Sequence, residues 1–234
     1  MQNKRLKMNI IKANNVNDVF IKVSNKLLKE GEIISPRDQE TKELTNTLIE
    51  VKNPGFMICS LKERDLNKQY LEAELNWYIN GTLDCTEIEK YSKFWSKLKN
   101  EKGEVNSNYG YIATKQKVNQ IKWCIKCLKE DYNSRQAVIN YNQPIHKYKN
   151  NKDFVCTLTQ QFMIRKGKLD TIVNMRSNDL IYGFTYDAPW FAYLQTQISI
   201  ALGLEQGRYY HFASSMHVYK KHYKMLKDIA DAKQ

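Results

Sequence analysis

The sequence predicts a layered α/β fold, organised as a single domain over residues 1–234. Three observations lead to this prediction. The chain has 234 residues, 42% of them hydrophobic, which is enough for a sizeable core. Segments with helical and with strand periodicity alternate along it, and most of the strand-like material lies in the second half. No internal repeat or low-complexity linker interrupts the chain.

The first half of the sequence predicts two helices and one pair of strands. An amphipathic helix is expected over 17–29. Strands are expected over 47–51 and 56–59, paired across an Asn-Pro-Gly turn. A second helix is expected over 65–80. A glycine follows each helix, as is typical of helix ends.

The stretch 153–190 carries the chemistry around which the rest of the chain is organised. It opens with Cys156 in a strand-like segment, passes a Lys-Gly-Lys turn and continues as a second β-rich run. Arg176 and two carboxylates, Asp179 and Asp187, follow, and a helix is expected to start at the last of these. A thiol, an arginine and carboxylates on adjacent short elements suit a nucleophile that attacks an anionic substrate.

Five further segments complete the expected fold. A helical period covers 117–130 and a strand is expected over 137–141. A long helix is expected over 188–202, with a proline in its first turn and a glycine after its end. A strand over 214–219 and a helix over 220–234 close the chain.

The composition excludes several classes of protein. A chain with 12% aromatic residues is not disordered, and no apolar run approaches the roughly 18 residues of a membrane span. The N-terminus lacks the apolar region of a signal peptide, so we expect a cytoplasmic protein without a membrane partner. The net charge of +12 suits an anionic ligand or follows from a lysine-rich composition. Aromatic and basic residues form no recognisable RNA-binding motif, so nucleic acid is not the expected partner.

The five cysteines indicate a reducing compartment, because they form an odd set without disulfide spacing. Cys124 and Cys127 lie on one face of an expected helix. No second such pair and no paired histidines accompany them, so we expect core packing and no metal, with a zinc or redox role as the alternative.

The residues of this central stretch resemble the thymidylate synthase superfamily. The resemblance is carried by Cys156, Gln161-Phe162, Gly167-Lys168-Leu169, Arg176-Ser177, Asp179 and Gly183. The run Asn-Met-Arg-Ser-Asn-Asp at 174–179 and the Asp187 position resemble the phage deoxycytidylate hydroxymethylases within it. The resemblance implies a mixed sheet packed against helices and a sheet-to-sheet homodimer. It also implies a nucleoside monophosphate substrate, a methylenetetrahydrofolate co-substrate and, if a phage encodes the chain, the host cytoplasm.

The resemblance assigns roles residue by residue. Catalysis is assigned to Cys156, Glu74, Tyr109 and Asp187. Nucleotide binding is assigned to Arg37, Arg135, Arg176, Ser177, Asn178, Asp179, His217 and Tyr219, with a phosphate site shared between subunits through Arg135. Folate binding is assigned to Trp95, Asp179, Tyr182, Gly183 and Tyr186. Without the resemblance, Glu74 would be a surface glutamate, Trp95 and Tyr109 core aromatics, and Arg37 a solvated loop charge.

Three features depart from the synthase pattern. Gln136 stands where synthases have a second arginine, which removes one cationic phosphate contact. Thr157 replaces the histidine common after the nucleophile, and the closing C-terminal tail of synthases is short or absent here.

Asp187 points to cytosine as the base. Synthases that act on uracil have an asparagine at this position, whose donor and acceptor match O4 and N3–H. Cytosine reverses that order, and a carboxylate accepts from N4–H₂ and favours protonation of N3. The alternative is that Asp187 only caps the following helix.

Several readings of the function stay open at this point. The first is a deoxycytidylate 5-hydroxymethyltransferase. Its rivals on the same fold are a dUMP or dCMP methyltransferase and a CMP hydroxymethylase. A catalytically idle, basic nucleic-acid-binding homologue is an alternative of a different class. The sequence does not decide whether the substrate sugar is ribose or deoxyribose. It also does not decide whether water or hydride is added in the final step.

Overall fold

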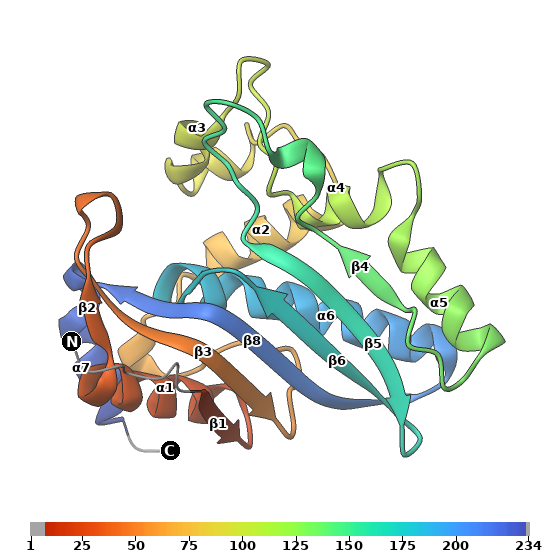
Figure 1. The fold of residues 1–234 in the computed structure, drawn as a ribbon, viewed down its shortest axis with the longest axis horizontal. Coiled ribbons are helices and arrows are strands. Elements are labelled where there is room, and N and C mark those ends of the chain that lie inside the picture. The colour runs from red at the N-terminus through yellow and green to blue at the C-terminus, as the bar shows by residue number, and fades with distance from the viewer. Residues whose placement is uncertain (1–7, 233–234) are drawn as a thin grey trace, which may run out of the picture. The chain divides into compact units, whose positions relative to one another are not determined.

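The contacts within the chain separate it into two compact units. Figure 1 labels their helices and strands. The computed structural model describes residues 8–232. The first unit comprises the described residues up to 66, together with 172–192 and 207–232; the second comprises 67–171 and 193–206. The single-domain organisation over 1–234 stays a prediction, because compact units can belong to one domain.

The first unit is built on a mixed sheet, as the fold class predicts. Strand β1 (Asn9–Ala13) runs parallel to β3 (Thr41–Val51), and β3 runs antiparallel to β8 (Glu205–Tyr219). Two short strands join them: β2 (Glu32–Ile34) pairs antiparallel with β3, and β7 (Asn178–Asp179) pairs parallel with β8.

Two helices pack in the first unit beside this sheet. Helix α1 (Val16–Glu30) contacts β1, β3 and α7 (Tyr223–Ala230), and it begins where the Asn15 side chain accepts from the backbone N–H of Asp18. Its buried face includes the four residues Val19, Phe20, Val23 and Leu27, all 0% exposed. Burying each such side chain stabilises the fold by about 1.5–3 kcal/mol, so this face fixes the helix on the sheet.

The second unit combines helices with an antiparallel strand pair. Its helices are α2 (Lys68–Asn80), α3 (Phe94–Leu98), α4 (Tyr109–Thr114) and α5 (Gln120–Glu130). Strands β4 (Val138–Asn140) and β5 (Thr157–Arg165) pair antiparallel, and α5 packs against both.

Strand β6 (Lys168–Met175), helix α6 (Thr185–Leu202) and strand β8 each contribute residues to both units. The turn before β6 has Lys166 and Gly167 at positive φ, 51° and 76°. Helix α6 follows a π-helix, η5 (Leu180–Phe184), directly. No helix in the range 8–232 is long and apolar enough to cross a membrane.

The predicted pairing of 47–51 with 56–59 is wrong. The segment 56–59 forms no strand, because the backbone turns at Met57, which has φ 55° and donates its N–H to the Pro54 carbonyl at 3.0 Å. Strand β3 pairs with β1, β2 and β8 instead. The other expected elements are present, although α2 begins at Lys68 and α6 at Thr185. The final expected helix is a 3₁₀ turn, η6 (Lys220–His222), followed by α7; its residues 233–234 lie outside the described range.

Candidate active site

Glu74 is buried, so its interpretation as a solvated surface glutamate is wrong. It lies on α2 with 4% exposure, and the hydroxyl of Tyr78, one turn further along, donates to its Oε1 at 3.0 Å. The Tyr78 ring stacks on Tyr109 with centroids 5.2 Å apart, and Tyr141 meets Tyr109 edge-on at 5.2 Å. The structure therefore links Glu74 and Tyr109, which are both predicted to act in catalysis, through Tyr78, which the sequence analysis missed.

Gly110 makes this arrangement possible. A Cβ atom on Gly110 would lie 1.5 Å from the carbonyl oxygen of Tyr78, which belongs to the backbone of α2. Only glycine allows α4 to approach α2 this closely. The Asn108 side chain adds a second link, because its Nδ2 donates to the Trp77 carbonyl at 2.9 Å.

Cys156 is half-buried and precedes β5 directly. Its Sγ lies 4.0 Å from the carbonyl oxygen of Phe154. Two hydrogen bonds anchor the segment before it. Asn142 Nδ2 donates to the Val155 carbonyl at 2.8 Å, and the Asp153 carboxylate accepts from the Ser107 N–H at 2.7 Å. These anchors, which sequence reasoning did not find, hold the thiol at the start of the strand.

The other four cysteines are buried: Cys59, Cys85, Cys124 and Cys127. Burial raises the pKa of each thiol, that of Cys124 to about 12. Burial of Cys124 and Cys127 on α5 agrees with the core-packing interpretation. Within residues 8–232, no group of three or more His, Cys, Asp or Glu side chains could hold a metal ion.

Trp95 and Arg135 occupy different environments. Trp95 is 5% exposed, meets the Trp77 ring edge-on at 4.8 Å and donates its Nε1–H to the Tyr70 hydroxyl at 3.0 Å. Arg135 is exposed in the loop before β4, and Gln161 Nε2 donates to its carbonyl at 2.9 Å. The folate role of Trp95 and the phosphate role of Arg135 stay predictions.

Asp179 and His217 lie side by side in the first unit, because the parallel pairing of β7 with β8 sets them in register. Asp179 begins the π-helix and accepts from the backbone N–H groups of Ile181, at 2.8 Å, and Tyr182. Its Oδ2 is buried without a hydrogen-bond partner in the described part of the chain. Burial raises the pKa of Asp179, while the nearby His217 and His222 oppose the rise.

His217 and Tyr219 share one face of β8, and their rings meet edge-on at 5.5 Å. Arg176 and Ser177 are half-buried between β6 and β7. Arg37 is exposed in a short turn with a positive φ of 53°.

Asp187 is held by a neighbouring amide. Asn178, which is 2% exposed, donates from Nδ2 to Asp187 Oδ2 at 2.9 Å. Gly183 leaves room for this contact, because a Cβ there would lie 2.6 Å from Nδ2. The alternative interpretation, in which Asp187 only caps the helix, is wrong: α6 begins at Thr185, so Asp187 lies inside its first turn.

A buried arginine supports the turn that carries these residues. Arg64 is 2% exposed, and its Nε donates to Thr185 Oγ1 at 2.9 Å and its Nη2 to the Ile181 carbonyl at 2.6 Å. Its guanidinium lies over the Tyr186 ring, 5.7 Å from the centroid. Tyr182 remains 53% exposed and packs against His222. Sequence reasoning missed Arg64, because one arginine in a polar run carries no pattern of burial.

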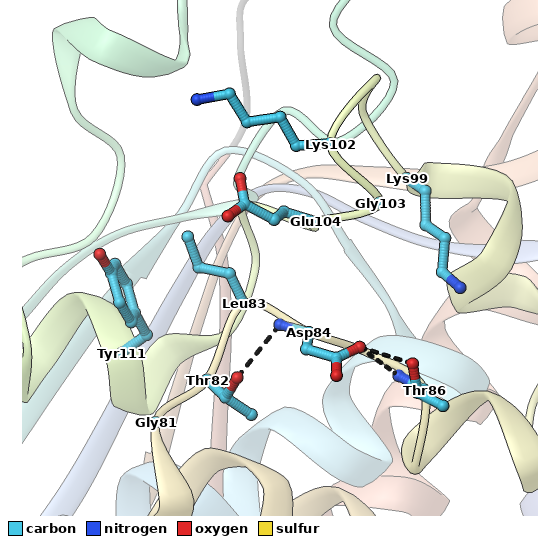
Figure 2. A pocket seen from close by; sticks show the side chains of 10 residues that line it. All are labelled: Gly81, Thr82, Leu83, Asp84, Thr86, Lys99, Lys102, Gly103, Glu104 and Tyr111. Atoms are coloured by element: carbon cyan, nitrogen blue, oxygen red, sulfur yellow. Dashed lines mark hydrogen bonds between the residues drawn. The ribbon is translucent and has the colours of Figure 1, made fainter.

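A cavity of about 650 Å³ lies in the second unit (Figure 2). Two of its lining side chains are engaged locally: Asp84 accepts from Thr86 (Figure 2), and Lys99 pairs with Glu89 at 2.7 Å. None of the predicted site residues is among its ten lining residues, which are Gly81, Thr82, Leu83, Asp84, Thr86, Lys99, Lys102, Gly103, Glu104 and Tyr111.

Comparison with known proteins decides the family. The family model described as thymidylate synthase matches residues 18–233. The chain belongs to the thymidylate synthase family. The resemblance and the fold predicted from the central stretch are thereby confirmed.

Relatives of this chain are named for different activities. The deoxycytidylate 5-hydroxymethyltransferase of Enterobacteria phage T4 is 34% identical over 174 residues, which is 69% of this chain and 71% of the relative. The deoxyuridylate hydroxymethyltransferase of Bacillus phage SP01 is 31% identical over 229 residues, 90% of this chain and 59% of that protein. A putative thymidylate synthase of Methanocaldococcus jannaschii is 32% identical over 214 residues, with 89% and 90% covered. Family membership and these relatives support a one-carbon transferase that uses nucleotide and folate substrates.

Proposed function

We propose that the chain is a folate-dependent 5-hydroxymethyltransferase that acts on deoxycytidylate. The reaction joins dCMP, methylenetetrahydrofolate and water, and it yields 5-hydroxymethyl-dCMP and tetrahydrofolate. The observation that carries the choice of base is the Asp187 carboxylate, half-buried in the first turn of α6 and bonded to the Asn178 amide. The 34% identity to the T4 deoxycytidylate enzyme supports the same choice.

A carboxylate at position 187 suits the Watson–Crick edge of cytosine. Both of its oxygens accept, so it can receive the N4–H₂ donor and favours a proton on N3. Uracil offers the O4 acceptor at the position of that donor. A carboxylate placed there leaves an acceptor facing an acceptor, and an unsatisfied buried pair costs about 1–3 kcal/mol.

Cys156 is the proposed nucleophile. Its thiolate adds to C6 of the pyrimidine, which turns C5 into a carbon nucleophile, and the C6–S bond breaks again at the end of the reaction. Cys156 fits this role better than the other four cysteines, because they are buried and their thiol pKa values are raised by burial.

Glu74 and Tyr109 are the proposed proton-handling residues. Glu74 accepts a hydrogen bond from Tyr78, and Tyr109 stacks on that same tyrosine. A buried carboxylate oriented by a phenol can exchange a proton with the base through an ordered water. Tyr78 is therefore proposed as the residue that orients Glu74.

The phosphate and the sugar are assigned to cationic and polar side chains. Arg37, Arg135, Arg176 and Ser177 are proposed to bind the phosphate, because a guanidinium matches phosphate oxygens with two parallel hydrogen bonds. His217 and Tyr219, which share a face of β8, are proposed to hydrogen-bond the sugar.

Asp179 fits a folate co-substrate. Its buried Oδ2 has no partner among the described residues and can accept from the N–H donors of a pterin ring. Tyr182, Gly183, Tyr186 and Trp95 are proposed to complete that site. When bound, the folate supplies a one-carbon unit at the oxidation level of formaldehyde.

A second candidate is the corresponding enzyme for deoxyuridylate. The SP01 deoxyuridylate hydroxymethyltransferase matches 90% of the chain and favours it. Methyl transfer, which requires hydride from the folate in place of water, and CMP as the substrate are further alternatives on the same fold. Intact Cys156, Arg176, His217 and Tyr219 argue against a catalytically idle nucleic-acid-binding homologue.

One incubation series separates these candidates. The protein is mixed with methylenetetrahydrofolate and with dCMP, CMP or dUMP in turn, and the product mass is measured. We expect dCMP to gain the mass of a hydroxymethyl group without formation of dihydrofolate. A methylated product accompanied by dihydrofolate, or turnover of dUMP in preference to dCMP, would contradict the proposal.

A further inference from the structure

The contact between Asn178 and Asp187 has a direction that the hydrogen-bond chemistry fixes. A carboxylate carries no hydrogen, so the group that faces Asp187 Oδ2 at 2.9 Å must be the Asn178 N–H donor. The reversed amide would set its oxygen against the carboxylate. Asn178 is 2% exposed, so its contact with Asp187 is made inside the protein and away from solvent.

We propose that Asn178 is a positioning residue that sets which group position 187 presents to the base. This inference rests on the proposed function, in which residue 187 reads the pyrimidine. Because Asn178 donates to Oδ2, the Asp187 carboxylate is held in one orientation. The same donor would also orient any amide that replaced the carboxylate.

Gly183 makes room for the hydrogen bond between Asn178 and Asp187. A Cβ on Gly183 would come within 2.6 Å of Asn178 Nδ2 and 3.3 Å of Asp187 Oδ2. The absence of a side chain therefore leaves the space in which the two groups meet. Gly183 does not have a positive φ, so alanine suits its backbone and would disturb only the contact.

The proposal predicts opposite behaviour for two variants that share the same residue at 187. In Asp187→Asn, the Asn178 N–H₂ donates to the oxygen of the new amide. The N–H₂ group of residue 187 then points toward the base. In the double variant Asn178→Asp/Asp187→Asn, the carboxylate at 178 accepts from the N–H₂ of the amide at 187. The amide oxygen and nitrogen therefore exchange positions. The amide then presents the reversed order of donor and acceptor to the base.

The test is a double-mutant cycle read as a ratio of kcat/KM for dCMP to kcat/KM for dUMP. Asp187→Asn should move the ratio toward dUMP by roughly one to two orders of magnitude. The exchanged pair, which has the composition and net charge of the wild type, should move it back by roughly tenfold or more. Asn178→Asp alone opposes two carboxylates and should lower kcat/KM for dCMP at least about tenfold.

Equal ratios in Asp187→Asn and in the exchanged pair would overturn the role of Asn178. Gly183→Ala provides a second measurement if the exchanged pair does not fold. It should lower the dCMP-to-dUMP ratio by roughly tenfold while the thermal unfolding midpoint stays near that of the wild type, and an unchanged ratio would overturn the proposal. A wild-type enzyme that prefers dUMP would contradict the proposed substrate alone, because the difference between the two asparagine variants still tests the orientation.

Discussion

At the scale of single residues, the reaction depends on a thiol. Cys156→Ser should lower kcat about a thousandfold or more, because a hydroxyl is a far weaker nucleophile than a thiolate at neutral pH. Binding of dCMP should stay largely intact, since the contacts to phosphate and base remain. Steady-state kinetics together with calorimetric titration of dCMP check both parts. A serine variant that keeps most of the activity would remove Cys156 from the mechanism.

His211 should make the stability of the chain sensitive to acid. It is 0% exposed, its Nδ1 lies 3.0 Å from the Tyr209 hydroxyl, and burial lowers its pKa to about 3. The unfolded chain binds this proton near pH 6.5, so the stabilisation is complete above that pH and falls as the pH drops toward the folded value. Between pH 7 and pH 5 the free energy of unfolding should fall by about 2 kcal/mol from this residue alone.

Denaturant unfolding at both pH values measures this effect, with His211→Leu as the matched variant that cannot titrate. The difference between wild type and variant cancels the contributions of other groups, such as Asp179, whose raised pKa acts in the opposite direction. The same pH dependence in both proteins would show that His211 does not titrate on unfolding.

At the scale of elements, the contact of α4 with α2 has no room for a side chain. Gly110→Ala should destabilise the protein by about 3 kcal/mol, because the new Cβ meets the Tyr78 backbone and α4 must move. Activity should fall with it, since Tyr109 moves as well. Gly55→Ala is the control: its φ is 53° and nothing lies within 4 Å, so only about 1 kcal/mol of backbone strain is expected. Equal losses in the two variants would contradict the close approach.

Helices with a regular apolar face could be predicted from the sequence, as α1 and α5 show. Strand pairing could not. Strand β3 pairs in register with residues of β8 far along the chain, whereas a turn-like Asn-Pro-Gly suggested a local partner. A periodic pattern reports which side of an element is buried, but it does not report which distant strand completes the ladder.

The candidate site divides in the same way. Residues in a contiguous motif, such as Arg176 to Asp179, could be predicted from their order, and their roles stay predictions. Supporting residues could not, because their role comes from burial. Tyr78 was one turn from Glu74 on an expected helix, and that spacing could have indicated the pair. Arg64 bonds to Thr185 across a long sequence separation, which no local pattern records.

At the scale of the whole molecule, we predict a homodimer whose phosphate sites are shared. One face of the sheet in the first unit carries an apolar row, Ile10, Leu48 and Phe212, in direct register across three strands. Ile10 is 57% exposed, and covering such a row removes apolar surface from water. Sizing at working concentration should therefore give twice the 27.6 kDa mass of the chain.

Mixing two inactive variants tests the shared site. Arg135→Ala and Cys156→Ala should each be inactive alone, and mixed dimers contain one site with both residues intact. Random exchange of subunits should restore up to about a quarter of wild-type activity. A monomer on sizing, or a mixture that regains nothing, would contradict the shared arrangement.

Four of the five cysteines are buried and Cys156 is half-exposed. This difference allows the fraction of functional protein in a preparation to be measured. A small alkylating reagent at neutral pH should modify the native chain once, and denaturant should release the remaining four thiols to reaction. Intact-mass spectrometry then gives the labelled fraction directly. If dCMP protects that single position, the fraction protected equals the fraction of the preparation that can bind substrate, so every rate measured on this protein can be normalised to functional sites.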